Sequence, residues 1–243
     1  MSSRLPDFLC VGTQKGGTTT LQKLLEKHPE TFLPSRKELQ FFSLHYERGK
    51  DWYCRQFEGA GENQRCGEIT PYYIFHPEAP ARIHKLIPDV RIIVLLRDPV
   101  ERALSHYFHA RRHGFESLEL KQALKSERER LASGSSFSHQ KHSYISRSLY
   151  IEQLSRLEDI FAPEQLLILR SEDLFDSTLS CWQEIQSFIG LSEIPLLNPL
   201  EKANAGSGEA NTVSYIVRDW LRCELRETVA EMERRYGISW NWS

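Results

Sequence analysis

The stretch that decides the fold runs from Phe8 to Leu25 and reads FLCVGTQKGGTTTLQKLL. Its first five residues, Phe8–Gly12, form a short apolar run that predicts a buried strand. After the turn, leucines recur at helical spacing, so we expect a helix over residues 18–27 with Thr18 or Thr19 as its cap. A strand, a glycine-bearing turn and a helix start together form the backbone of an anion-binding loop.

The turn itself carries residues suited to binding a phosphate. Gly16 and Gly17 let the backbone approach ligand oxygens, Lys15 supplies a positive charge, and Thr18 and Thr19 supply hydroxyl donors. A phosphate-binding loop is therefore one interpretation. The other is a tight glycine turn that only joins a strand to a helix.

The loop departs from the Walker A pattern of nucleotide triphosphatases. The spacing of Gly12 and Gly17 fits that pattern, but Thr18 stands where it has lysine. The lysine and Ser/Thr pair that handles the terminal phosphates and Mg²⁺ is missing from this position. A P-loop nucleotide kinase and a non-catalytic nucleotide-binding module are alternative functions for such a chain.

The rest of the chain alternates apolar runs with segments of helical spacing. The further predicted strands are 66–69, 90–96 and 166–169, and the further predicted helices are 98–113, 176–189 and 213–236. Two segments rich in small polar residues are predicted to be loops, 132–143 and 198–211. We therefore predict an α/β fold: one domain over residues 1–243, with a doubly wound parallel sheet flanked by helices around a P-loop-like nucleotide-binding core.

Composition and charge restrict the classes of partner. The 243 residues carry a net charge of −2, which does not favour nucleic acid or an anionic membrane as a partner. No apolar run approaches the roughly 20 residues of a membrane span, so no transmembrane segment is expected. The five cysteines are scattered without a CxxC pair, which predicts reduced thiols in a cytoplasmic protein. The sequence leaves the oligomeric state open.

Five blocks of sequence, taken together and in their order along the chain, indicate a protein family. They are VGTQKGGTTTLQKLLEKHP from Val11, KELQFF from Lys37, GEITPYY from Gly67, RIIVLLRDPVERALSHYFH from Arg91, and SRSLYIEQLSRLEDIFAPEQLLILRSEDL from Ser146. In this order they resemble the 3′-phosphoadenylyl-sulfate-dependent sulfotransferases, above all the heparan-sulfate-type and related bacterial branch. The resemblance extends over most of the chain from Phe8 to Leu191.

The resemblance implies a reaction and a set of donor contacts. The reaction moves a sulfuryl group from 3′-phosphoadenylyl sulfate to an acceptor, releases adenosine 3′,5′-bisphosphate and needs no metal. The loop around Lys15 would bind the 5′-phosphosulfate and stabilise the leaving phosphate. Arg97 and Ser105 would hold the 3′-phosphate, while Lys202 and Asn204 lie where the family closes a loop over the nucleotide.

Glu38 matches the general base of the family. A positioned carboxylate can remove the proton of an acceptor hydroxyl in the transition state. The acceptor implied is a hydroxyl, or with less support an amine, of a small molecule, lipid, glycan or carrier-bound intermediate. Ile69 stands where the heparan-type enzymes carry lysine, so a second cation is missing or comes from elsewhere.

These assignments have ordinary structural alternatives. Glu38 could be a solvated surface glutamate, which is the usual place of a lone glutamate. Arg97 could form a capping ion pair with Asp98 or Glu101 at a helix start. Three histidines share one helix face, 106, 109 and 113, but a partly solvated basic face accounts for them and no metal site is predicted.

Overall fold

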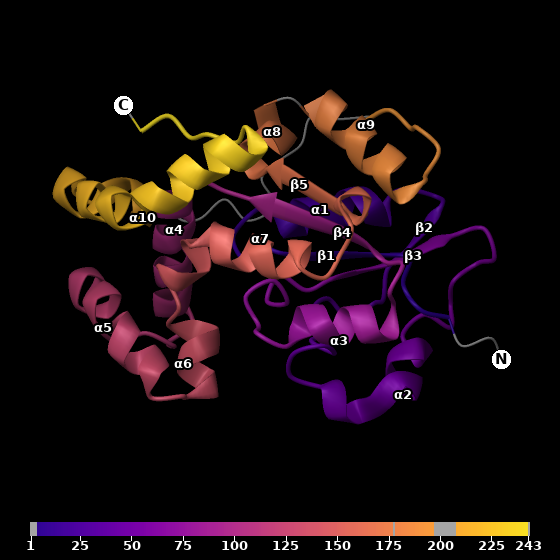
Figure 1. Ribbon diagram of the computed structural model, residues 1–243, viewed down its shortest axis with the longest axis horizontal. Coiled ribbons are helices and arrows are strands. Elements are labelled where there is room, and N and C mark those ends of the chain that lie inside the picture. Colours follow the sequence, from indigo (N-terminus) through magenta and orange to yellow (C-terminus); the bar gives the residue numbers. More distant parts are fainter. Residues whose placement is uncertain (1–3, 177, 197–207, 243) are drawn as a thin grey trace. The chain divides into compact units, whose positions relative to one another are not determined.

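Five parallel strands form the sheet that positions the candidate site. In the computed structural model, which describes residues 4–176, 178–196 and 208–242, the strands follow the spatial order β2-β3-β1-β4-β5 (Figure 1). Their bounds are β1 (Phe8–Gly12), β2 (Thr31–Phe32), β3 (Arg65–Ile69), β4 (Arg91–Leu96) and β5 (Leu166–Arg170). The predicted strands are thus confirmed, and the 90–96 strand is an inner one, between β1 and β5.

The chain folds into two units. Unit 1 comprises Met1–Leu96 and Ser155–Asn204, and unit 2 comprises Arg97–Leu154 and Ala205–Ser243. All five strands belong to unit 1. The prediction of one domain over the whole chain stays a prediction.

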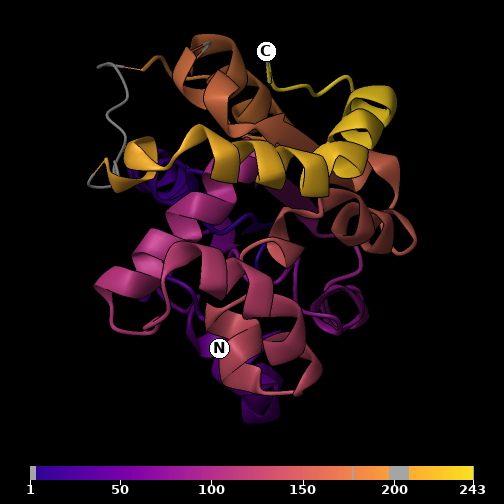
Figure 2. The same cartoon turned by 90° about the vertical axis from the view of Figure 1, so that its left-hand side faces the viewer.

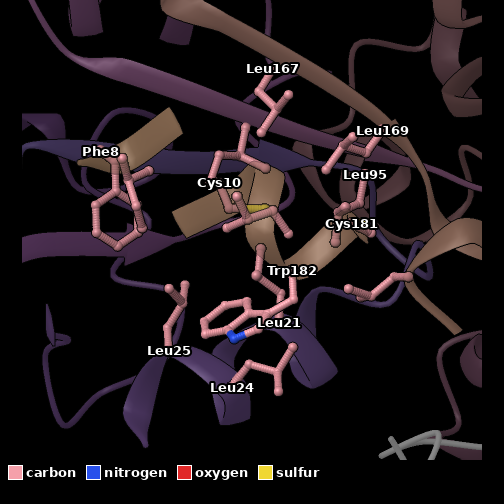
Figure 3. Packing of buried hydrophobic residues seen from close by; sticks show 14 of the residues in the cluster. Phe8, Cys10, Leu21, Leu24, Leu25, Leu95, Leu167, Leu169, Cys181 and Trp182 are labelled. Atoms are coloured by element: carbon pink, nitrogen blue, oxygen red, sulfur yellow. The ribbon is translucent and has the colours of Figure 1, made fainter. Parts of the chain in front are cut away.

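Helices cover both faces of the sheet in unit 1. They are α1 (Thr18–Glu26), α2 (Gly49–Arg55), α3 (Ala79–Leu86), α8 (Ser171–Asp176) and α9 (Thr178–Ile189), and α7 (Tyr150–Glu158) crosses the division between the units. One core cluster joins side chains of β1, β4 and β5 to α1 and α9, with Leu21 and Trp182 facing the strands (Figure 3). Helix α3 lies on the other side of the sheet from α9 (Figure 1). This arrangement confirms the doubly wound α/β fold.

The strand order places the topological switch point beside β1. The chain leaves β1 toward β2 and β3 on one side, and then crosses over to β4 and β5 on the other. In open α/β sheets, ligands bind at the carboxyl ends of the strands where the winding direction changes. Here those ends are Gly12 of β1 and Leu96 of β4.

Unit 2 is helical and has its own core. Its helices are α4 (Pro99–Arg112), α5 (Leu120–Ala132), α6 (Ser136–Lys141) and α10 (Tyr215–Tyr236). Leu104 and Tyr107 of α4 pack in one cluster with Leu221 and Leu225 of α10, which contacts α4 (Figure 2). Short 3₁₀ helices complete the described elements of the two units: η1 (Tyr46–Arg48), η2 (Ser146–Ser148), η3 (Pro163–Gln165) and η4 (Glu209–Thr212).

One prediction about the elements is wrong. The segment 132–143, predicted to be a loop, contains α6, whose start is capped by Ser135 through a 3.3 Å hydrogen bond from the Ser138 N–H. The helix predicted over 176–189 is confirmed for its described residues, which lie at the end of α8 (Ser171–Asp176) and in α9 (Thr178–Ile189).

The cysteines are free thiols, as predicted. All five are unbridged, and Cys223 is the exposed one. Among the helices that the structure describes, none combines the length and the apolar character that a membrane span requires.

Candidate active site

The loop between β1 and α1 is fixed to the end of β4. The backbone N–H and the hydroxyl of Thr13 both donate to the Leu95 carbonyl, at 2.8 Å and 2.9 Å. Gly16 N–H in turn donates to the Thr13 carbonyl at 2.9 Å. A Cβ on Gly16 would lie 2.5 Å from the Leu95 carbonyl oxygen, so this position accepts only glycine. Packing on β4, and not only closeness to a ligand, therefore explains Gly16.

Helix α1 starts at this loop without a side-chain cap. Gly17 is the N-cap, in the left-handed region with φ 88°, and no side-chain oxygen accepts there. The expected capping role of Thr18 or Thr19 is therefore wrong. The first turn holds no acidic residue, so the positive end of the helix dipole has no carboxylate of its own there. That end is suited to an anionic ligand.

Two of the predicted site residues have strained backbones. Among the described residues other than glycine, positive φ angles occur at Lys15 (72°), Glu38 (56°) and Gln40 (57°). Each such conformation costs on the order of 1–2 kcal/mol for an L-residue. Strain of this kind persists only where the surroundings hold the residue, and it concentrates at functional sites. The two residues predicted to act in catalysis, Lys15 and Glu38, thus share this property.

The segment that carries Glu38 is anchored by its apolar neighbours. Leu39, Phe41 and Phe42 are fully buried, whereas Glu38 is half-buried. The Phe41 ring stacks on Tyr53 with centroids 4.3 Å apart and planes at 9°. Glu38 accepts a 3.2 Å hydrogen bond from the Gln40 side-chain amide. Glu38 is therefore not the fully solvated glutamate of the structural alternative.

A buried carboxylate, Glu68, ties this segment to β3. It accepts hydrogen bonds from the hydroxyls of Tyr53, Thr70 and Tyr73 at 2.5, 2.6 and 2.7 Å. Burial raises the pKa of Glu68, and the three hydroxyl donors oppose that rise. Because Tyr53 also stacks on Phe41, the KELQFF and GEITPYY blocks meet in one hydrogen-bonded aromatic cluster.

Lys37, next to Glu38, reaches the start of α1. Its ammonium donates a 2.5 Å hydrogen bond to the hydroxyl of Thr19 in the first turn of α1. Burial lowers the pKa of Lys37, although nearby Glu38 partly offsets the effect. Sequence reasoning singled out Glu38 and missed this lysine. The signal available was the isoleucine at position 69, which left the family's second cation unassigned.

Arg97 and Ser105 belong to unit 2. Arg97 directly follows β4, and its carbonyl accepts a 2.7 Å hydrogen bond from the Tyr150 hydroxyl. Ser105 is half-buried in α4, eight residues further along the chain. The structure thus places Arg97 at the predicted strand end and Ser105 on the predicted helix.

The carboxylates named in the capping alternative for Arg97 have other partners. Asp98 caps α4, with its Oδ1 accepting from the Val100 and Glu101 N–H groups at 2.9 and 3.0 Å. The Oδ2 atom of Asp98 accepts from the Trp242 indole at 2.7 Å, and Glu101 forms an ion pair with Arg218. Asp98 is therefore the residue that caps the first N–H groups of α4.

The remaining candidates are the nucleotide-closing pair and the histidines of α4. Lys202 and Asn204 lie outside the described residues. His106 is buried, whereas the rings of His109 and His113 contact each other with centroids 4.1 Å apart. Within residues 4–176, 178–196 and 208–242, no three His, Cys, Asp or Glu side chains cluster as metal ligands would.

Comparison with known proteins identifies similar chains. A family model described as the sulfotransferase domain matches residues 5–226. Bifunctional heparan sulfate N-deacetylase/N-sulfotransferase 3 of Homo sapiens is 35% identical over 201 residues, which cover 77% of this chain and 22% of that protein. Heparan sulfate glucosamine 3-O-sulfotransferase 3A1 of Mus musculus is 31% identical over 198 residues, covering 79% of this chain and 48% of that protein.

A solved structure extends the similarity to nearly the whole chain. A sulfotransferase from Alicyclobacillus acidocaldarius has a TM-score of 0.82 and 26% sequence identity, and the match covers 98% of each chain. By contrast, the chain spans less than half the length of the two curated relatives, at 22% and 48%.

Proposed function

Because this chain belongs to the sulfotransferase family, we propose that it transfers a sulfuryl group from 3′-phosphoadenylyl sulfate to an acceptor hydroxyl. The observation that carries the proposal is the loop between β1 and α1. It is fixed to Leu95, holds Lys15 in a strained conformation and leads into a helix start with no acidic residue. These features suit the binding of a phosphosulfate group.

The proposed chemistry moves one group and one proton. The bond between the donor's sulfur and its bridging phosphate oxygen breaks, and that oxygen keeps the electron pair. The acceptor oxygen forms the new bond to sulfur as its proton passes to the Glu38 carboxylate. The products are the sulfated acceptor and adenosine 3′,5′-bisphosphate. Lys15 and the first N–H groups of α1 offset the charge that develops on the leaving phosphate.

The nucleotide end of the donor is assigned by resemblance. We propose that Arg97 and Ser105 bind the 3′-phosphate, as the residues at these positions do in the family. Arg97 can donate two parallel hydrogen bonds to a phosphate, which suits it to this task. Lys202 and Asn204 are proposed to contact the same nucleotide.

The acceptor is proposed as a class. Two relatives carry heparan sulfate in their names, which supports a glycan or a small molecule with a comparable hydroxyl. An amine acceptor ranks second. Lipids and carrier-bound intermediates belong to the same proposal because they present hydroxyls of the same reactivity.

A titration of nucleotides tests the proposed donor. Calorimetry should show 3′-phosphoadenylyl sulfate and adenosine 3′,5′-bisphosphate binding to the wild type without a metal. Mg²⁺–ATP is expected to bind with a much lower affinity than either of these two ligands. Lys15→Ala should weaken both bisphosphorylated ligands about tenfold to a hundredfold, the usual effect of a lost charged hydrogen bond. Preferential binding of Mg²⁺–ATP would support the kinase alternative and overturn the proposal.

A further inference from the structure

We propose that Lys37 is a further catalytic residue, which contacts the phosphosulfate of the donor together with Lys15. The inference deepens the proposed function and rests on it. It assigns the second positive charge of the site to the lysine that directly precedes the proposed base, Glu38.

The first argument is position. The ammonium of Lys37 lies 2.5 Å from the Thr19 hydroxyl, and Thr19 is the second residue of α1. The loop that precedes this helix carries Lys15. An anion bound at the start of α1 would therefore lie within reach of the Lys37 ammonium. Glu38 directly follows Lys37 in the sequence, so the proposed base and the proposed cation belong to one segment.

The second argument is electrostatic. Positive charge is unfavourable at a helix N-terminus, where the macrodipole is itself positive. Lys37 is also half-buried, and burial lowers the pKa of its ammonium. Glu38 offsets part of this, but no acidic residue lies in the first turn of α1. A cation in such a place is explained by an anion that binds there, and the phosphosulfate is the anion that the proposed reaction supplies.

The third argument concerns position 69. Ile69 is 4% exposed and belongs to the hydrophobic core cluster of the sheet, so this position supplies no charge. Lys37 is thus placed to stabilise the charge on the bridging phosphate oxygen as its bond to sulfur breaks. Such stabilisation is strongest in the transition state, which makes Lys37 relevant to rate as well as to binding.

The test compares ligands with and without a 5′ group. Lys37→Met removes the charge and keeps the chain length, and Lys37→Arg keeps the charge. Lys23→Met is the matched control, because Lys23 is an exposed lysine in the last turn of the same helix. The ligands are 3′-phosphoadenylyl sulfate, adenosine 3′,5′-bisphosphate and adenosine 3′-phosphate, which lacks a 5′ group. Affinities come from calorimetry or competition, and folding is checked by thermal melting.

Lys37→Met should weaken the two ligands that carry a 5′ group about tenfold to a hundredfold and change adenosine 3′-phosphate less than about twofold. Lys37→Arg should recover most of the affinity, and Lys23→Met should match the wild type. Equal weakening of all three ligands would make Lys37 a structural tether and overturn the inference. If Lys37→Met binds the donor as tightly as the wild type does, the inference is overturned and the proposed function still stands. No donor binding by the wild type would overturn the proposed function first, and the inference with it.

Discussion

The Tyr73 hydroxyl accepts a 3.3 Å hydrogen bond from the backbone N–H of Phe42. Tyr73 follows β3 at the end of the GEITPYY block, and Phe42 belongs to the segment that carries Glu38. The same hydroxyl donates to Glu68, which is buried at the end of β3. The segment that carries the proposed base is thus held by a buried network that begins at Glu68 of β3.

Removing this hydroxyl should loosen the segment. Tyr73→Phe leaves the Phe42 N–H without its acceptor and Glu68 without one of its donors. The expected cost is about 1–3 kcal/mol in the free energy of unfolding, as for other buried polar groups that lose a partner. Transfer should fall more than affinity for adenosine 3′,5′-bisphosphate, because the network supports Glu38. Urea unfolding measures the change in stability. Separate measurements of kcat and of nucleotide affinity show which of the two falls more.

Tyr46→Phe is the control for that experiment. Tyr46 packs on Phe41 in the same aromatic cluster, with ring centroids 5.5 Å apart. Its substitution should change stability by less than about 0.5 kcal/mol, as is usual away from buried networks. If Tyr73→Phe behaved like this control, the claim that the network supports the segment carrying Glu38 would be contradicted.

Donor choice should depend on Arg97. If its guanidinium binds the 3′-phosphate, the wild type should prefer 3′-phosphoadenylyl sulfate over adenylyl sulfate about tenfold to a hundredfold. Arg97→Ala should lose most of that preference and leave adenylyl sulfate affinity nearly unchanged. Calorimetric titration of both nucleotides against both proteins measures it. Equal affinities in the wild type would refute the role given to Arg97.

Chelation should leave the reaction intact. Thr18 stands where Walker A loops have the lysine that precedes the Mg²⁺-binding Ser/Thr, and the proposed charge stabilisation comes from lysine side chains and helix N–H groups. Donor binding and transfer are therefore expected to survive excess EDTA. Activity that EDTA abolished and Mg²⁺ restored would contradict this expectation and favour a kinase-like mechanism.

Acid should weaken unit 2 through Glu116. Burial by itself raises the pKa of this carboxyl, but hydrogen bonds from Arg130, the Leu118 N–H and Tyr144 outweigh burial and lower the pKa to about 2. A carboxyl whose pKa is lower in the folded state than in the unfolded state stabilises the protein at pH values above its unfolded-state pKa, 4.5. This contribution is lost as the pH falls from 4.5 toward 2. The shift corresponds to about 3 kcal/mol at neutral pH.

Glu116→Gln should therefore be destabilised at neutral pH, with a deficit that shrinks as the pH falls through this window. Glu119→Gln is the matched control, because the Glu119 side chain is 85% exposed and its ion pair with Arg111 is 3.4 Å long. That change should cost less than about 1 kcal/mol at any pH. Urea unfolding across the acid range checks both variants, and a pH-independent deficit for Glu116→Gln would contradict the linkage.

The strands are readable from the sequence for a physical reason. Inner parallel strands are buried on both faces, so β1 and β4 appear as nearly continuous apolar runs, and the edge strand β5 is apolar as well. Helix α6 is not readable, because its serine-rich sequence lacks an apolar period. It forms through the Ser135 cap and through a 2.9 Å hydrogen bond between His142 Nε2 and the Phe115 carbonyl at its end.

The site is partly readable. Motif spacing identifies Lys15 and Glu38 as candidates, but their positive φ angles depend on tertiary packing and leave no signal in the sequence. The reach of Lys37 to Thr19 depends on the path of the chain after β2 in the same way. Glu68 lies in a quoted motif, yet only the structure shows its three hydroxyl donors.

The central claim is that Glu38 removes the acceptor's proton in a sulfuryl transfer. The measurement is transfer of labelled sulfuryl from 3′-phosphoadenylyl sulfate to a panel of hydroxyl acceptors, by the wild type and by Glu38→Gln. The variant keeps the side-chain volume and removes the base, so transfer should fall about 10²–10⁴-fold. Affinity for adenosine 3′,5′-bisphosphate should stay nearly unchanged. Turnover of Glu38→Gln above about a tenth of the wild-type value would contradict the claim, because removing a general base produces a larger loss than that. His45 or His76 would then be tested as the base.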